Sequence, residues 1–196
     1  MNICVFSSSS NGIDQSYFEE ANQLGTLIGT HGHTLINGGA NVGLMEAVTI
    51  AAKNRGARTI GIIPQQMQKR NLVSENSHEV IITDNMQERK ASMRNMSDAF
   101  IALPGGFGTP EEILEVLTLK QLAYHNKPVV FINTKKFFEY LLLQFEKSFH
   151  EYFAKKEYRQ LYFIADNSES AINYIETYQP VAQISKWFKV PGKKDR

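Results

Sequence analysis

Short apolar runs alternate along the chain with longer segments in which apolar residues recur at helical spacing. Short continuous runs are typical of strands buried on both faces, and they occur at residues 3–6, 34–36, 59–63, 79–83, 99–103, 128–132 and 162–165. The helical spacing predicts helices over residues 14–30, 43–55, 85–96, 109–124, 135–149 and 169–177. The alternation predicts a parallel sheet with helices on both faces.

Local signals fix several boundaries within this pattern. Asp14 is placed to cap the first helix, and Asn85 with Glu88 has the spacing of a capping box. Residues 65–77 are polar and aperiodic, so we expect a loop there. We find no internal repeat, so residues 1–178 are predicted to form one α/β domain, Rossmann-like and doubly wound. Residues 179–196 are predicted to form a C-terminal arm or tail.

The polar segments that follow the strands share one geometric property. If the strands are parallel, all of these segments lie at the same edge of the sheet, where ligands bind in open α/β folds. The segments are residues 7–12, 38–39, 64, 84–85 and 105–109. We therefore expect the functional site at this edge.

The most informative of these segments is a glycine-rich loop between a strand and a helix. Residues 103–112 read Leu-Pro-Gly-Gly-Phe-Gly-Thr-Pro-Glu-Glu. Thr109 is a good helix N-cap and Pro110 suits the first helical position. Backbone amides at such a helix start bind anions, most often phosphate. The loop matches neither a Walker A motif nor a complete dinucleotide fingerprint, so a tight turn without a ligand is the alternative.

Two further segments on the same edge are candidates. Residues 38–45 join a strand to a helix through a second glycine turn, which could also be a plain turn. Arg89 and Lys90 lie near the start of a helix, where the helix dipole disfavours cations, and this favours an anionic partner. The alternative is an exposed pair neutralised by Glu88 and Asp84.

Glu112 admits two interpretations. The spacing of Thr109 and Glu112 is that of a capping box, in which Glu112 would have a structural role. The same carboxylate would also lie at the mouth of an anion site. Glu111 is a second candidate acid, or a residue matched to the helix dipole.

Composition narrows the function classes. The chain has 21 basic and 20 acidic residues and a net charge of +1, which gives no reason to expect a nucleic-acid partner. The single cysteine, Cys4, is predicted to be a core residue. The five histidines show no metal-binding spacing, and His31 and His33 are expected in a surface turn. We see no leader sequence and no membrane span, and we expect a cytoplasmic protein.

Taken together, the motifs resemble the LONELY GUY (LOG) family of cytokinin-activating nucleoside 5′-monophosphate phosphoribohydrolases. The resemblance spans about residues 3–145 and is carried by the serine cluster, a Gly-Gly-x-x-x-Gly-Leu-Met turn, an Ile-Pro strand end, Met-x-x-Arg-Lys, and Pro-Gly-Gly-x-Gly-Thr-x-x-Glu. The combination of the last two motifs is highly specific.

The resemblance implies a role for each matched residue. Arg89 and Glu112 match the pair regarded as catalytic. The phosphate is expected at Gly105, Gly106, Phe107, Gly108 and Thr109, and the other substrate-binding positions are Ser8, Gly39, Arg89, Lys90, Glu111 and Thr118. The family implies a nucleoside 5′-monophosphate substrate, no metal or organic cofactor, and at least a homodimer.

Four positions depart from the family pattern. Glu46 and Ala123 replace glycines, Asn71 stands where many members have glutamate, and Leu119 replaces a tryptophan.

The reaction implied by the resemblance is hydrolysis of the N-glycosidic bond to free base and ribose 5-phosphate. Two rivals are a pyridoxal-phosphate-dependent lysine decarboxylase, for which no lysine motif is visible, and a non-catalytic nucleotide or cofactor carrier such as the molybdenum-cofactor carrier proteins.

Overall fold

The predicted sheet is present in the computed structural model, which describes residues 1–182 and 184–185. Seven strands pair in parallel in the order β4-β3-β2-β1-β5-β6-β7. The strands are β1 (Asn2–Phe6), β2 (Thr34–Asn37), β3 (Thr59–Pro64), β4 (Glu79–Thr83), β5 (Ala99–Ala102), β6 (Val129–Ile132) and β7 (Phe163–Ala165). The Rossmann-like α/β prediction is therefore confirmed.

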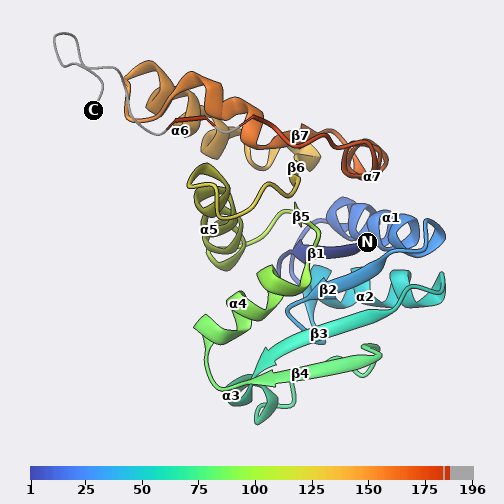
Figure 1. The fold of residues 1–196 in the computed structure, drawn as a ribbon. Helices are drawn as coiled ribbons and strands as arrows, with labels where there is room; N and C mark the ends of the chain where they lie inside the picture. The colour runs from blue at the N-terminus through green and yellow to red at the C-terminus, as the bar shows by residue number, and fades with distance from the viewer. Residues whose placement is uncertain (183, 186–196) are drawn as a thin grey trace, which may run out of the picture.

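Helices cover the two faces of the sheet (Figure 1). The α-helices are α1 (Gln15–Thr30), α2 (Gly43–Asn54), α3 (Gln65–Gln68), α4 (Met86–Met96), α5 (Gly108–Gln121), α6 (Glu139–His150) and α7 (Ser168–Glu176). Two 3-10 helices, η1 (Thr134–Lys136) and η2 (Lys156–Leu161), complete the described elements. Helices α1, α2 and α7 pack on one face, while α4, α5 and α6 pack on the other.

Successive side chains of each strand point to opposite faces of the sheet, so the two faces have separate hydrophobic cores. In β1, Ile3 and Val5 point into the core shared with α1, α2 and α7, whereas Cys4 and Phe6 point into the core shared with α4 and α5. Cys4 is fully buried, as expected of a core residue, and its desolvation raises the pKa of the thiol well above its usual range.

The chain order creates one switch point in the sheet. The chain proceeds from β1 through β2 and β3 to β4, and then returns to place β5 against the other side of β1. In open α/β sheets the crevice outside the carboxyl ends of two such strands is the ligand site. The serine cluster follows β1 and the glycine loop follows β5, so both lie at this crevice.

Several boundaries differ from the sequence prediction. The segment 65–77 is not wholly a loop, because it begins with α3 and Val73 forms an antiparallel bridge with Ala40. The helix expected from residue 135 begins only at Glu139, because Lys135 and Lys136 have φ values of 53° and 59°.

The predicted C-terminal arm, residues 179–196, lies largely outside the described residues, since 183 and 186–196 are not among them. Among the described residues, no helix has both the length and the apolarity that crossing a bilayer requires.

Candidate active site

The start of α5 presents a row of unpaired backbone amides. The amides of Gly105, Gly106, Phe107 and Gly108 donate no hydrogen bond to any residue that the structure describes. Phe107 is the N-cap and provides no side-chain cap. The prediction that Thr109 caps the helix is therefore wrong. These amides keep their hydrogen-bonding capacity at the positive end of the helix dipole, which is the arrangement that binds phosphate.

Glycine occupies the positions of this loop for different structural reasons. A Cβ atom on Gly105 would lie 2.0 Å from Thr109 Oγ1, so the loop closes against the start of α5 only with glycine there. A Cβ atom on Gly106 or Gly108 would meet no atom within 4 Å. Neither has a positive φ. The packing of the described chain does not require glycine at these two positions, whereas a ligand lying on the amides would.

Arg89 and Glu112 form a buried ion pair that joins α4 to α5. The Nη1 atom of Arg89 lies 2.6 Å from Oε1 of Glu112, and the two side chains are 8% and 11% exposed. The Nε atom of Arg89 also donates to the Ile62 carbonyl at 2.9 Å, near the end of β3. Of the two interpretations of Glu112, the capping box with Thr109 is therefore excluded, because the hydrogen-bond partner of Glu112 is Arg89.

Gly38 makes room for this arginine. A Cβ atom on Gly38 would lie 2.1 Å from Arg89 Nη2 and 2.9 Å from Met45 Sδ. The turn after β2 therefore accommodates the guanidinium group that pairs with Glu112. This observation relates two motifs of the sequence, the second glycine turn and the Arg-Lys pair, as parts of one site.

Burial raises the pKa of the Glu112 carboxyl above its ordinary value, although the charge and hydrogen bond of Arg89 act in the opposite direction. A carboxylate whose pKa is raised by a dry environment is a better proton acceptor near neutral pH. Perturbed carboxylates of this kind are concentrated at functional sites.

Lys90 has other partners than expected. Its Nζ atom bonds Glu111 and lies 3.2 Å from Glu115 Oε2, and Arg94 Nη1 lies 2.9 Å from the same Glu115 oxygen. The hydrogen bond to Glu111 raises the pKa of Lys90. The alternative in which Arg89 and Lys90 are neutralised by Glu88 and Asp84 is therefore wrong. The Glu88 amide donates to the Asn85 side chain, as the capping-box prediction requires. The Glu88 carboxylate accepts from the Asp84 amide and the Asn85 side chain instead of the Asn85 amide, so only half of the predicted box is present.

The serine cluster connects β1 to both glycine turns. Ser8 donates its amide to the Pro104 carbonyl at 3.2 Å, and its own carbonyl accepts from the Leu44 amide at 2.9 Å. Ser7, which the sequence did not single out, has a buried hydroxyl without a hydrogen-bond partner among the described residues. An unpaired buried hydroxyl at a strand end beside the crevice is a signal that only the structure reveals.

A pocket of about 270 Å³ opens beside the glycine loop. Ser8 and Ser10 line it with Gly105 and Gly106, and the aromatic rings of Tyr17 and Phe137 are also part of its wall. The two rings meet edge to face with their centroids 6.0 Å apart. The pocket therefore combines backbone amides with an apolar, aromatic side, as small-molecule sites commonly do. Sequence spacing gave no signal for either ring.

Two of the predicted site residues neither line this pocket nor belong to the Arg89–Glu112 pair. Gly39 has a φ of 69°, and a Cβ atom there would lie 3.1 Å from the Gly61 backbone, so strand packing accounts for it. Thr118 is exposed on α5, nine residues after Thr109. That separation corresponds to about 13 Å along the helix.

Two departures from the family pattern have structural partners. Glu46 accepts hydrogen bonds from Ser74 Oγ at 2.5 Å and from Asn76 Nδ2 at 2.7 Å, so it anchors the segment after α3. Asn71 has a φ of 55°, a conformation that asparagine tolerates better than glutamate, and its carbonyl accepts from Asn41.

Solved structures with this fold are known. The molybdenum cofactor carrier protein of Chlamydomonas reinhardtii is 26% identical with a TM-score of 0.68, covering 89% of this chain and 94% of that one. The molybdenum cofactor binding protein of Rippkaea orientalis is also 26% identical, with a TM-score of 0.66 and coverage of 90% and 94%.

Sequence comparison is more specific. A family model described as "Possible lysine decarboxylase" matches residues 45–175. Cytokinin riboside 5′-monophosphate phosphoribohydrolase LOG5 of Arabidopsis thaliana is 38% identical over 179 residues, which cover 91% of this chain and 78% of that protein. LOG1 of the same plant is 39% identical over 189 residues, with coverage of 94% and 89%. The chain therefore belongs to the family described as possible lysine decarboxylases and, within it, to the LONELY GUY phosphoribohydrolases.

Proposed function

We propose that this protein hydrolyses the N-glycosidic bond of nucleoside 5′-monophosphates, with cytokinin riboside 5′-monophosphate, AMP or both as substrates. The products are the free base and ribose 5-phosphate. The observation that carries the proposal is the row of four unpaired amides at the start of α5, at the point where the sheet reverses its order. The buried Arg89–Glu112 pair supplies the reacting group that a simple phosphate-binding protein does not need.

In this proposal the 5′-phosphate lies on the amides of residues 105–108 and on the hydroxyl of Thr109. The open space at Gly106 and Gly108 lets the phosphate oxygens approach the backbone. Binding at the phosphate, away from the breaking bond, positions the ribose and contributes energy that lowers the barrier.

Glu112 acts on the ribose. Cleavage of the bond between C1′ and the base nitrogen builds positive charge on the ribose ring, as in glycoside hydrolysis. The Glu112 carboxylate stabilises this charge and accepts a proton from the attacking water, whose oxygen bonds to C1′. The electrons of the broken bond stay on the base nitrogen, which takes a proton from solvent, and Glu112 then returns its own proton to solvent. Arg89 holds the carboxylate in place and orients the phosphate and ribose through its planar guanidinium group.

The remaining predicted residues have different places in this proposal. Ser8 lines the pocket, Gly39 shapes the turn after β2, and Lys90 with Glu111 forms the rim while linking α4 to α5. Thr118 lies too far along α5 to reach the same site, so it serves the site of a second copy in a homodimer. The cytoplasmic location expected from the sequence remains a prediction.

The direct test follows base release by chromatography after incubation with AMP, CMP, GMP and isopentenyladenosine 5′-monophosphate. We expect release from at least one nucleotide, no release from the matching nucleoside, and a loss of about 100-fold or more in Glu112→Gln. Glu139→Gln, an exposed glutamate at the start of α6, is the matched control and keeps full activity. Near-normal turnover in Glu112→Gln would contradict the catalytic assignment.

The likeness to molybdenum cofactor carriers supports one further candidate, a non-catalytic carrier. Tight nucleotide or cofactor binding without release of base from any substrate would favour it. An absorbance band of bound pyridoxal phosphate in the purified protein would instead support a lysine decarboxylase, the activity in the family description.

A further inference from the structure

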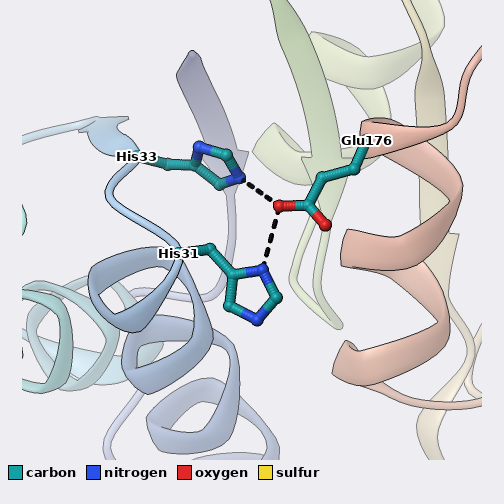
Figure 2. Close-up of side chains that lie close together, drawn as sticks. All are labelled: His31, His33 and Glu176. Carbon is teal, nitrogen blue, oxygen red and sulfur yellow. Dashed lines mark hydrogen bonds and ion pairs between the residues drawn. The ribbon is translucent and has the colours of Figure 1, made fainter.

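The side chains of His31, His33 and Glu176 point toward one another (Figure 2). They lie where β2 begins, at the end of the sheet opposite to the glycine loop. His31 is the C-cap of α1, His33 directly precedes β2, and Glu176 is the last residue of α7. His31 Nδ1 lies 2.9 Å from Glu176 Oε1, and His33 Nε2 lies 3.0 Å from the same oxygen. The expected surface turn at His31 is present, but His33 is buried.

We propose that these three side chains bind a zinc ion that fastens α7 to the turn between α1 and β2. The three potential ligand atoms all lie within 4.8 Å of one another. Two ligands of one tetrahedral zinc ion stand about 3.4 Å apart, given bonds of about 2.1 Å. Small ring movements therefore bring the three atoms to coordination distance.

The chemistry of the three donors suits zinc. Two imidazole nitrogens and one carboxylate oxygen form a set that zinc proteins use, and a water completes the tetrahedron. The side chains of His31 and Glu176 are 34% and 32% exposed, which leaves a path for the ion and for that water. Harder ions such as Mg²⁺ prefer sites made only of oxygen ligands.

The surrounding backbone also favours a cation. Both α1 and α7 end at this cluster, so the negative ends of two helix dipoles point toward it. The negative charge of Glu176 in the last turn of α7 interacts unfavourably with the helix dipole. A bound cation would make the net charge at this helix end positive and the interaction favourable. The His33 Nδ1 atom lies 3.4 Å from the Met1 amino group, so Nε2 is the ring nitrogen that faces Glu176.

A hydrogen-bonded clamp without metal is the alternative. Two imidazole N–H groups that each donate to Glu176 Oε1 satisfy the same distances. The zinc site and the clamp differ in one measurable property, which is uptake of an ion. Zinc binding also predicts a thermal stabilisation that depends on metal concentration, whereas a hydrogen-bonded clamp predicts none.

The test titrates the metal-stripped full chain with Zn²⁺ in competition with a chromophoric chelator. We expect one ion per chain, and a loss of affinity of about tenfold or more in His31→Ala and in Glu176→Gln. His150→Ala, which removes an exposed histidine at the end of α6, is the matched control and binds zinc like the wild type. Circular dichroism of all variants excludes misfolding as the cause.

Two further readouts complete the test. A Zn²⁺ concentration about 100-fold above Kd should raise Tm by about 5 °C or more in the wild type and the control, but not in the other two variants. Co²⁺ in place of Zn²⁺ should give the visible absorption of a four-coordinate ion. No uptake at micromolar Zn²⁺, or uptake unchanged in His31→Ala and Glu176→Gln, would overturn the proposal.

Discussion

The guanidinium group of Arg89 is held between the Ile62 carbonyl and the Glu112 carboxylate, with Nη1 2.6 Å from Oε1. The two charged residues come from different helices and are 23 positions apart. Each is nearly buried, so each charge depends on the other to offset its loss of hydration. This pair therefore links the stability of the fold to the chemistry proposed for the site.

Removing one member of the pair should be costly. Arg89→Met leaves Glu112 buried without its counter-ion, and we expect the free energy of unfolding to fall by about 3–5 kcal/mol. The double variant Arg89→Met with Glu112→Leu should recover much of this loss and still release no base. Urea unfolding of both variants measures the difference. Equal destabilisation in the single and double variants would show that the charge of Glu112 is not the cause.

Gly38→Ala should impair the site through Arg89. The new methyl group would lie 2.1 Å from Arg89 Nη2, so the guanidinium group must move away from Glu112. We expect kcat/KM for the best nucleotide to fall on the order of 10- to 100-fold, because small displacements of positioning groups have effects of this size. Steady-state kinetics measures this effect, and an unchanged kcat/KM would argue against a role for the Arg89 position.

Gly106→Ala should separate binding from stability. The methyl group meets open space and the backbone there has no positive φ, so we expect Tm to stay close to that of the wild type. We expect KM for the nucleotide to rise about tenfold, since the methyl occupies space next to the phosphate-binding amides. Thermal unfolding and kinetics on the same preparation check both results. A normal KM would place the phosphate elsewhere.

Lys120 predicts a pH dependence of stability. Its Nζ atom has no hydrogen-bond partner among the described residues, and burial lowers its pKa to about 8 from an ordinary 10.5. Between these values the unfolded chain binds more protons than the folded one, so the contribution of Lys120 to stability rises with pH. Below pH 8, Lys120 is protonated in both the folded and the unfolded chain, so the full cost of burying its charge lowers the stability.

Lys120→Met should therefore stabilise the protein at pH 7, by about 1–2 kcal/mol. The gain should shrink between pH 8 and pH 10. Urea unfolding at pH 7 and pH 9.5 tests this, with Lys147→Met on the exposed surface of α6 as the control. A gain that is the same at both pH values would mean that packing, not charge, is responsible.

The sheet was predictable from the sequence because its central strands are buried on both faces, and continuous apolar runs such as residues 99–103 are typical of such strands. Local capping was predictable only where the partners are near in sequence and free of a stronger partner. The Asn85 side chain caps the Glu88 amide as predicted, whereas Glu112 bonds Arg89 in preference to Thr109. A long-range ion pair overrides a local pattern that the sequence displays clearly.

The sequence did not indicate which residues far apart in the chain meet at the two sites. Tyr17 and Phe137 share a pocket wall, although one lies in α1 and the other follows η1. Glu176 lies 143 positions from His33, so the histidine spacing alone could not indicate a third ligand. The glycine loop was predicted correctly as a strand-to-helix connection because all of its determinants are contiguous.

The position of Cys4 gives the protein an internal reporter. It is the only thiol in the chain, it lies in β1 between β2 and β5, and it is fully buried. A thiol reagent can reach it only when the centre of the sheet opens, so the labelling rate in native buffer measures how often the whole domain opens. Local fluctuations of the glycine loop or of α7 would leave that rate unchanged, so the labelling rate of this thiol reports global unfolding alone.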